Sequence, residues 1–505
     1  MSITLEHLAE VAGGRIVHPA ELTVAGISIN AQACGQQDVF AAVPGTRAHG
    51  AEYAADSAAG VIITDADGAA ILQAAGDTRP LVVVDNVRRV LGPTSSELYG
   101  NPSHKLTIIG MTGTSGKTTT SYLVEAALMK AGHSVGLIGT TGTRINGEPI
   151  PTSLTTPEAP TLQQLFATMV DKGVTHVVME VSSHAITLGR VAGTRFAVKG
   201  FSNLSQDHLD FHHSMQEYYE AKAQWFTDLN DDCRAVVVLA DQWGARLAEE
   251  HADFADAVDV NAGIDAPARF VVRDAIPTEG GGHSFTFVDE KTGKQTVVTL
   301  PLPGRFNVAN AALALGMLAE VGEDLHSCAN ALRELAVPGR MERVDVGQRF
   351  IAVVDYAHKP AAIAAVLETL RGQVPGRIGI VVGAGGDRDA GKRPIMGAEA
   401  VKGADFVVIT DDNPRSEDPE LIRDAVEEGA HAARRELDRE VDVVVIGDRA
   451  RAIDAVVNWA QPGDAIVVAG KGHETGQLIN GVTHPFDDRV ELRRSLMQRA
   501  QRGRL

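Results

Sequence analysis

Short apolar runs alternate with helix-like stretches along most of the chain, and this alternation restricts the fold more than any other feature. Stretches such as Thr118–Lys130 and Thr161–Asp171 separate the runs in the middle of the sequence, and the pattern returns after residue 350. Strands that alternate with helices build βαβ units, so we expect an α/β fold with mainly parallel sheets. The strand-like runs are Leu106–Ile109, Val135–Ile138, His176–Glu180, Val198–Phe201, Ala235–Leu239, Ile351–Asp355, Ile378–Val382, Phe406–Thr410, Val443–Ile446 and Ala465–Ala469.

The length of 505 residues predicts about three domains, at roughly 100–200 residues each. Turn-forming residues interrupt the pattern at Tyr99–Lys105 (YGNPSHK) and at Val337–Arg340 (VPGR). We therefore expect a small N-terminal α/β domain over 1–104, a central domain over 105–336 and a C-terminal Rossmann-like α/β domain over 337–505. Segment 269–300 alternates as hairpins do, which predicts a small antiparallel insertion in the central domain.

Acidic residues outnumber basic ones, 65 to 46, and the net charge of −19 argues against a nucleic-acid binder. The first residues lack a basic stretch followed by an apolar one, and no apolar run approaches the roughly 20 residues that span a bilayer. We expect a soluble, cytoplasmic protein. Cys34, Cys233 and Cys328 are far apart and indicate buried thiols rather than a disulfide framework.

The strongest local motif is GMTGTSGKTTT at Gly110–Thr120, which follows a predicted strand and opens a predicted helix. This context is typical of a phosphate-binding loop, in which backbone N–H groups and a helix N-terminus face phosphate oxygens. Met111 stands where the strict GxxxxGK pattern has its first glycine. We expect Lys117 to reach the β- and γ-phosphates and Thr118 to bind Mg²⁺, which makes the central domain a P-loop domain. A GTPase is less favoured because no NKxD-type signature is present.

Polar residues are dense between Glu180 and Lys222. Glu180 closes a predicted strand, where open α/β sheets place ligand groups. Together with His208 it is suited to hold Mg²⁺ with several waters. Zinc is disfavoured, because neither an HExxH motif nor a cysteine partner accompanies the histidines.

Three loops of the third domain follow strand ends of a single predicted sheet, and such ends converge on one crevice. They contain Arg388 in GAGGDRD, Arg415 in DNPR and Glu474 in AGKGHE. The first loop fails the GxGxxG spacing, which argues against a nicotinamide site. An arginine such as Arg415 is suited to a bidentate grip on a carboxylate.

Taken together, these motifs closely resemble the Mur ligases of peptidoglycan synthesis. The resemblance covers essentially the whole chain, and DNPR and GKGHE are similar to the members that add meso-diaminopimelate. The motifs are TGTSGKTT (112–119), TTPE (155–158), EVSSHAI (180–186), NLSQDHLDFH (203–212), EAK (220–222), GRFNVANAAL (304–313), PGRME (338–342), DYAHKP (355–360), DNPR (412–415) and GKGHE (470–474).

The resemblance implies an ATP-dependent ligation. ATP would phosphorylate the D-glutamate γ-carboxyl of UDP-N-acetylmuramoyl-L-alanyl-D-glutamate, giving an acyl phosphate and ADP. The amine of meso-diaminopimelate would then displace phosphate. The resemblance also implies Mg²⁺ as cofactor and the three domains binding nucleotide-sugar, ATP and amino acid in chain order. We expect a monomer.

The resemblance implies a role for each matching position. Lys117, Glu180, His208 and Lys222 would be catalytic, and Thr118, Glu180, His208 and Lys222, the last as its N6-carbamate, would bind Mg²⁺. ATP would contact Gly113, Thr114, Ser115, Gly116, Lys117, Thr118, Thr119, Asn307, Asn310, Arg340 and Asp355. The UDP-sugar dipeptide would contact Ser28, Thr155, Thr156, Ser183 and Arg190. Diaminopimelate would contact Arg388, Asp412, Asn413, Pro414, Arg415, Gly470 and Glu474.

One stretch departs from the family pattern. Asn30–Gln32 reads NAQ where members usually have DSR, which weakens the expected uridine or phosphate contact there and the neighbouring role of Ser28. Three alternatives stay open: a lysine-adding homologue, a folylpolyglutamate synthetase-like ligase, and a nucleotide-binding scaffold without catalysis. DNPR argues against the first, EVSSHAI with TTPE against the second, and the retained Lys117, Glu180, His208 and Lys222 against the third.

Overall fold

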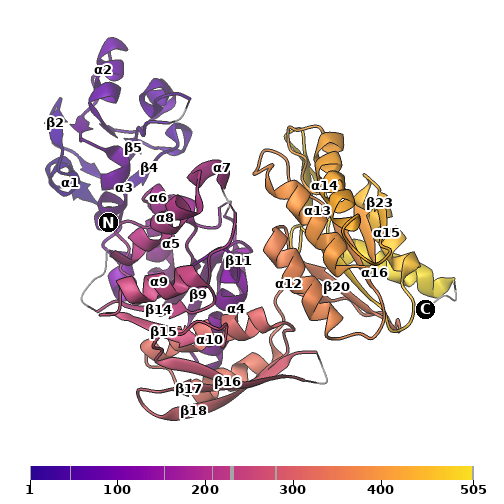
Figure 1. Cartoon of the computed structure of the whole chain (residues 1–505). Coiled ribbons are helices and arrows are strands. Elements are labelled where there is room, and N and C mark those ends of the chain that lie inside the picture. Colours follow the sequence, from indigo (N-terminus) through magenta and orange to yellow (C-terminus); the bar gives the residue numbers. More distant parts are fainter. Residues whose placement is uncertain are drawn as a thin grey trace.

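The computed structural model describes residues 2–45, 47–152, 154–207, 209–227, 232–278 and 281–502. Three large sheets follow one another along the chain and form three lobes, with the C-terminal lobe beside the central one (Figure 1). This confirms the α/β class. No helix in the described ranges combines the length and apolar character needed to cross a membrane.

The N-terminal sheet has the strand order β2-β7-β6-β5-β4, parallel except for the β2–β7 pair. A two-stranded β1–β3 pair adjoins it. Cys34 is buried in this lobe, as Cys233 and Cys328 are in the central one, and all three thiols are free, as predicted. The elements are β1 (Ile3–Thr4), α1 (Leu5–Ala12), β2 (Arg15–Val17), β3 (Thr23–Val24), β4 (Gly26–Ser28), β5 (Asp38–Ala41), β6 (Val61–Thr64), α2 (Ala66–Ala74), β7 (Leu81–Val83) and α3 (Val87–Leu98).

The central lobe contains one 11-stranded sheet in the order β11-β10-β9-β12-β8-β13-β14-β15-β16-β17-β18. Its strands are β8 (Thr107–Thr112), β9 (Val135–Gly139), β10 (Gly142–Ile145), β11 (Glu148–Ile150), β12 (His176–Glu180), β13 (Val198–Phe201), β14 (Arg234–Val238), β15 (Ala255–Asp259), β16 (Phe270–Pro277), β17 (His283–Asp289) and β18 (Lys294–Leu300). Its helices are α4 (Lys117–Lys130), α5 (Ala159–Asp171), α6 (Ser183–Thr187), α7 (Leu209–His212), α8 (Met215–Thr227), α9 (Gln242–Glu250), α10 (Arg305–Glu320) and α11 (Leu325–Ala331).

The seven strands from β9 to β16 are parallel, and they carry the predicted phosphate loop at their carboxyl edge. The chain runs from β8 outward to β9, returns to β12 beside β8, and then continues on the opposite side with β13. Ligands bind at such a reversal of strand order in open α/β sheets. The loop after β8 therefore opens into the crevice.

The predicted antiparallel segment forms β16–β18, and it extends the parallel sheet rather than making a separate one. The β10–β11 hairpin at the opposite edge was not predicted. It is short and polar, so its alternation is too weak to stand out in the sequence.

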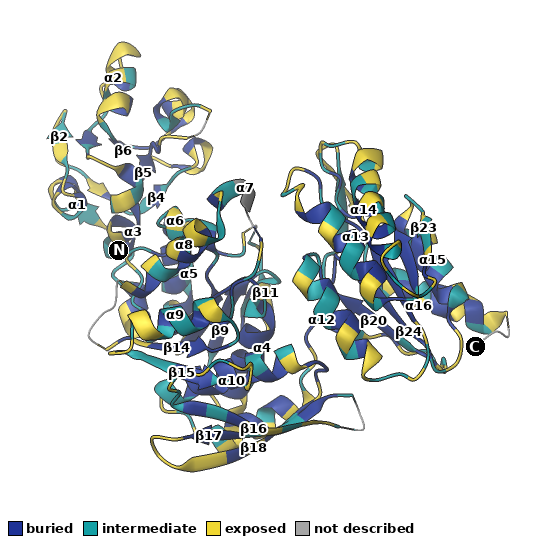
Figure 2. Ribbon diagram, viewed as in Figure 1, coloured by how far each residue is buried: buried dark blue, intermediate teal, exposed yellow. Residues whose placement is uncertain are grey.

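The C-terminal sheet has the order β19-β20-β24-β21-β22-β23 and is parallel apart from β19. Its inner strands, such as β20 and β24, lie dark blue between helices in Figure 2, as expected for a sheet covered on both faces. The elements are β19 (Glu342–Arg343), β20 (Ile351–Asp355), α12 (Pro360–Arg371), β21 (Ile378–Val382), α13 (Lys392–Gly403), β22 (Phe406–Ile409), α14 (Pro419–Arg434), β23 (Asp442–Val445), α15 (Arg449–Trp459), β24 (Ala465–Ala469), the hairpin β25 (Gly476–Ile479) and β26 (Val482–Pro485), and α16 (Asp488–Gln501).

A buried ion pair fastens α16 to this lobe, because Arg449 donates to both carboxylate oxygens of Asp488 at 2.7 Å and neither side chain is exposed. Asp488→Ala is expected to lower the free energy of unfolding of this domain by about 3–5 kcal/mol, because it leaves the buried Arg449 guanidinium without its counter-charge. Denaturant unfolding followed by circular dichroism measures the change. Arg494→Ala, which breaks a half-exposed pair with Asp454, is the control and should cost less than about 1 kcal/mol.

Candidate active site

A cavity of about 670 Å³ lies between the central and C-terminal domains. One wall is the phosphate loop and the carboxyl ends of the central strands. The facing wall is made by the loops that follow β20, β21, β22 and β24. Predicted residues that line it are Thr114, Ser115, Gly116, Lys117, Thr118, Thr119, Thr155, Glu180, Asn307, Asn310, Arg340, Asp355, Arg388, Asp412, Asn413, Arg415, Gly470 and Glu474.

The phosphate loop requires its two inner glycines. Gly113 and Gly116 have φ values of 143° and 92°, which side chains rarely adopt. A Cβ on Gly113 would lie 2.0 Å from Ser202 Oγ, and one on Gly116 would lie 2.2 Å from Asn310 Oδ1. The loop then leads directly into α4 at Lys117, so the N–H groups of the first helical turn face the cavity.

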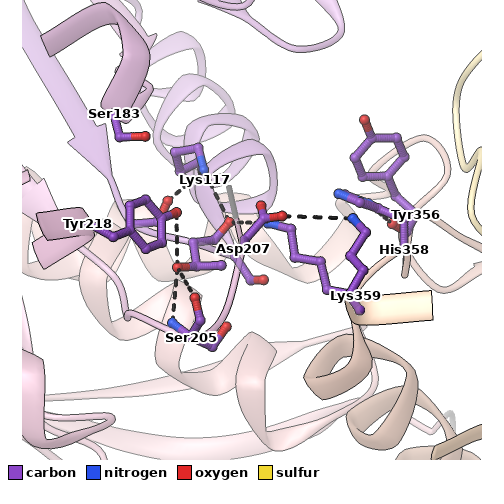
Figure 3. Close-up of polar contacts among 12 residues, drawn as sticks. Lys117, Ser183, Ser205, Asp207, Tyr218, Tyr356, His358 and Lys359 are labelled. Carbon is purple, nitrogen blue, oxygen red and sulfur yellow. Dashed lines mark hydrogen bonds and ion pairs between the residues drawn. The ribbon is translucent and has the colours of Figure 1, made fainter. Parts of the chain in front are cut away.

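Four cationic side chains surround this loop. Lys117 Nζ donates to Gly113 O at 2.7 Å, and Lys222 Nζ donates to the same carbonyl at 3.1 Å. From the C-terminal domain, Lys359 Nζ donates to Thr114 O at 2.9 Å and pairs with Asp207 at 2.8 Å (Figure 3). Arg340, the fourth, donates to the Thr118 hydroxyl at 3.0 Å.

Burial and neighbouring positive charges lower the pKa values of the two lysines nearest the loop, Lys117 and Lys222. Burial, followed by the positive charge of Lys359, lowers the pKa of Lys117 to about 8. Burial, followed by Lys117 and Lys359, lowers the pKa of Lys222 well below its usual value. A lysine whose pKa is lowered in this way loses its proton more readily, and the uncharged amine is the form that reacts with electrophiles.

The low pKa of Lys117 predicts an alkaline limit for ATP use. Because Lys117 loses its charge as the pH rises through about 8, kcat/KM for ATP should fall above that pH, and this parameter reports groups of the free enzyme. Lys359→Met removes the neighbouring charge and should move the falling limb to higher pH. If the falling limb keeps its position in Lys359→Met, the loss of activity at high pH does not come from the titration of Lys117.

Glu180 ends β12 with its carboxylate inside the cavity, 1% exposed. It accepts hydrogen bonds from the Thr140 N–H at 3.0 Å and the Thr140 hydroxyl at 2.9 Å. A buried carboxylate and the Thr118 hydroxyl in the same cavity are hard oxygen donors that fit Mg²⁺. His208, predicted to complete this set, lies outside the described residues.

Contacts with neighbouring residues fix the side chains that are predicted to bind the nucleotide. Asn307 donates to Pro303 O at 2.7 Å and accepts from the Asn310 side chain at 3.0 Å. Asp355 accepts from the Met341 N–H at 2.7 Å, and the Arg340 guanidinium lies 4.4 Å from the centre of the Tyr356 ring. Burial raises the pKa of Asp355.

The predicted amino-acid residues meet at the other end of the cavity. Asn413 donates to Glu474 at 2.9 Å, and burial, followed by the charge of Asp412, raises the pKa of Glu474. Arg415 donates to Gly386 O at 2.6 Å and has a φ of 56°, which turns the DNPR loop toward β25. Lys471, fully buried, donates to Asn413 Oδ1 at 2.8 Å.

Several predicted residues do not line the cavity. Gly113 and Pro414 lie behind its walls in the phosphate and DNPR loops, and Lys222 lies behind the phosphate loop on α8. Arg190 pairs with Glu158 at 2.8 Å and donates to Thr156 O at 3.2 Å. Ser183 Oγ and His212 Nε2 lie 2.9 Å apart, and Ser28 Oγ accepts from the Asn30 N–H at 3.0 Å in the N-terminal domain.

Sequence reasoning missed several residues that line the cavity, among them the charged Asp207, Lys359 and Lys392. Asp207 lies in NLSQDHLDFH and Lys359 in DYAHKP, so both motifs pointed at the right loops. The ion pair between them joins two domains across 152 positions of sequence, and no local pattern reports such a contact.

The fold and this cavity define a P-loop enzyme with a second α/β domain facing its phosphate loop, and two family models match the chain. Residues 111–318 match the Mur ligase middle domain and 339–472 match the Mur ligase, glutamate ligase domain. The chain belongs to the Mur ligase family.

Its relatives carry a more specific name. The chain is 56% identical to UDP-N-acetylmuramoyl-L-alanyl-D-glutamate--2,6-diaminopimelate ligase of Corynebacterium efficiens, with 98% of this chain and 95% of that protein covered. It is 45% identical to the ligase of the same name from Streptomyces avermitilis, with 97% and 96% covered. A solved structure of a ligase of that name matches with a TM-score of 0.68 at 31% identity, covering 99% of this chain and 100% of that one.

Proposed function

We propose that this protein is an ATP-dependent ligase that joins meso-diaminopimelate to the D-glutamate γ-carboxyl of UDP-N-acetylmuramoyl-L-alanyl-D-glutamate. The proposal rests on one feature: the phosphate loop and the DNPR and GKGHE loops line the same cavity from opposite sides. Relatives that match over nearly the whole chain carry the name of this activity.

Phosphorylation of the γ-carboxylate gives the reaction a leaving group. A carboxylate oxygen attacks the γ-phosphorus of ATP, the bond to ADP breaks, and an acyl phosphate forms. Lys117 and the N–H groups at the start of α4 neutralise the charge on the transferred phosphoryl group. Thr114, Ser115 and Gly116 cradle the other phosphates, with Asn307, Asn310, Arg340 and Asp355 orienting the nucleoside.

The second step forms the amide. The uncharged amine of diaminopimelate attacks the acyl carbon, phosphate leaves from the tetrahedral intermediate, and the amine loses its proton. Positioning supplies much of the rate, because both reactants are held in one cleft. Thr155 lies on the wall beside Glu180, and we assign it to the glutamyl end of the nucleotide-sugar, with Thr156, Ser183, Arg190 and Ser28 along the remainder.

Mg²⁺, when bound, would screen the phosphate charges between nucleotide and carboxylate. Glu180 and Thr118 would hold it, with His208 and carbamylated Lys222 as further ligands. Carbamylation turns a cation into an anion, which makes Lys222 compatible with this position.

The domains would divide the substrates in chain order: 1–104 for the nucleotide-sugar, 105–336 for ATP and 337–505 for the amino acid. The cleft between the second and third would have to bring ATP and amine together. A monomeric state and a cytoplasmic location stay predictions of the sequence.

Phosphate release from ATP in the presence of UDP-N-acetylmuramoyl-L-alanyl-D-glutamate tests the proposal. We expect release that depends on meso-diaminopimelate and is much slower with L-lysine. Turnover with a folate and glutamate instead would favour a folylpolyglutamate synthetase-like enzyme. Nucleotide binding without any turnover would favour a scaffold.

A further inference from the structure

Two helices of the central domain end in the same way and bring two polar side chains together, far from the cavity. At the end of α4 the N–H groups of Gly132 and His133 donate to Met129 O and Leu128 O. At the end of α10 those of Gly322 and Glu323 donate to Ala319 O and Leu318 O. Both are glycine-terminated Schellman caps, which hold the following residue in a defined position. His133 and Glu323 occupy the equivalent place in each.

A second histidine completes the group. His176 is the first residue of β12, and its ring centre lies 4.0 Å from that of His133. His133 Nε2 lies 2.8 Å from a carboxylate oxygen of Glu323. One ligand atom from each of the three side chains lies within 4.8 Å of the others, the only such three-residue group of His, Cys, Asp and Glu in the parts of the chain that the structure describes.

A hydrogen bond orients the ring of His176. The Thr175 hydroxyl lies 2.9 Å from His176 Nδ1 and 3.2 Å from Ser134 O. In the tautomer whose Nδ1 donates to this hydroxyl, Nε2 carries the lone pair. Histidines that bind metals use this arrangement, in which the other ring nitrogen donates to a fixed acceptor.

The surroundings favour a cation. Glu323 supplies one negative charge, and the carbonyl ends of α4 and α10 each add partial negative charge. The side chain of Glu323 is 14% exposed and that of His133 31%, so solvent ions have access.

We propose that His133, His176 and Glu323 form a binding site for a divalent transition metal of the Zn²⁺ type. Two imidazoles and one carboxylate form a donor set that suits Zn²⁺, with water completing the tetrahedron, whereas Mg²⁺ prefers oxygen ligands alone. Small side-chain rotations would bring the three ligand atoms to coordination distance of a single metal ion. Since α4 spans about 21 Å from Lys117 to Lys130 at 1.5 Å per residue, the metal would sit remote from the ATP site. It would tie the far ends of α4, α10 and β12 together.

Cobalt titration of the full-length protein tests this site. Excess Mg²⁺ is present throughout to occupy oxygen-rich sites of the cavity. We expect one equivalent of Co²⁺ to give the visible absorption of a low-coordinate nitrogen-containing site, and Zn²⁺ to abolish it. Glu323→Gln and His133→Gln should each weaken Zn²⁺ binding by about tenfold or more, since even outer-shell groups are worth about 10–100-fold. Zn²⁺ should raise the Tm of the wild type and not that of Glu323→Gln.

The control is His431→Gln. His431 and Glu427 form a pair at 3.1 Å on α14, so this variant removes a histidine beside a carboxylate elsewhere. It should bind Co²⁺ as the wild type does. Metal-free melting curves identify any variant that is destabilised, and both Glu323→Gln and His133→Gln change residues at solvent-accessible helix ends. Equal Co²⁺ affinity and spectra in the wild type and both variants, or no Co²⁺ bound beside Mg²⁺, would overturn the proposal.

Discussion

Lys222→Ala is expected to lower kcat by about 10²–10³-fold, and added bicarbonate should not restore it. Lys222 is 1% exposed and lies under the phosphate loop, where burial, followed by the charges of Lys117 and Lys359, lowers the pKa of its amine. An uncharged amine attacks the carbon of CO₂, a C–N bond forms, a proton is lost, and the side chain becomes an anion. The surrounding cations then stabilise that anion, and alanine can form none.

Lys222→Arg separates the carbamate from a simple requirement for positive charge, because arginine stays cationic and forms no carbamate. We expect it to be as inactive as Lys222→Ala. Lys130→Ala changes an exposed lysine of the same domain and should behave as the wild type. ¹³C-bicarbonate NMR should show one carbamate signal in the wild type that both Lys222 variants lack. Full activity in Lys222→Arg would remove the carbamate from the reaction.

Arg415→Met is expected to abolish most of the discrimination between meso-diaminopimelate and L-lysine. Diaminopimelate carries a carboxylate at the end where lysine has only an amine. In the wild type, lysine would leave the half-buried guanidinium unpaired and facing a cation, which is worth about 10⁴-fold. The variant should lose roughly a hundredfold in kcat/KM for diaminopimelate, and its kcat/KM for lysine should rise by roughly a hundredfold because the unpaired guanidinium is gone.

The comparison is made by phosphate release with each amino acid at matched ATP concentration. Arg435→Met, an exposed arginine that caps α14, is the control and should keep the wild-type preference. Because Arg415 also has a left-handed backbone, circular dichroism and the KM for ATP check that the DNPR loop change leaves the nucleotide side intact. An unchanged preference in Arg415→Met would assign the distal carboxylate to another group, with Arg388 the nearest candidate.

Local sequence patterns predicted the elements well. The strands His176–Glu180, Val198–Phe201, Ile351–Asp355, Ile378–Val382 and Ala465–Ala469 form with the predicted bounds, and the others differ by a few residues at their ends. These strands are continuous apolar runs bounded by turn residues, so their signal is local and strong. The β10–β11 and β25–β26 hairpins were missed because their short, polar strands carry little such signal.

The sequence by itself determined the parallel sheets, the phosphate loop and the loops at the strand ends, since glycine spacing, apolar periodicity and turn chemistry act over neighbouring residues. Only the tertiary structure decided which of these loops meet. The pairing of Lys359 with Asp207, the burial that lowers the pKa of Lys222, and the joining of His133, His176 and Glu323 depend on how distant segments pack. Coulomb interactions and desolvation follow distance in space, and distance along the chain does not report it.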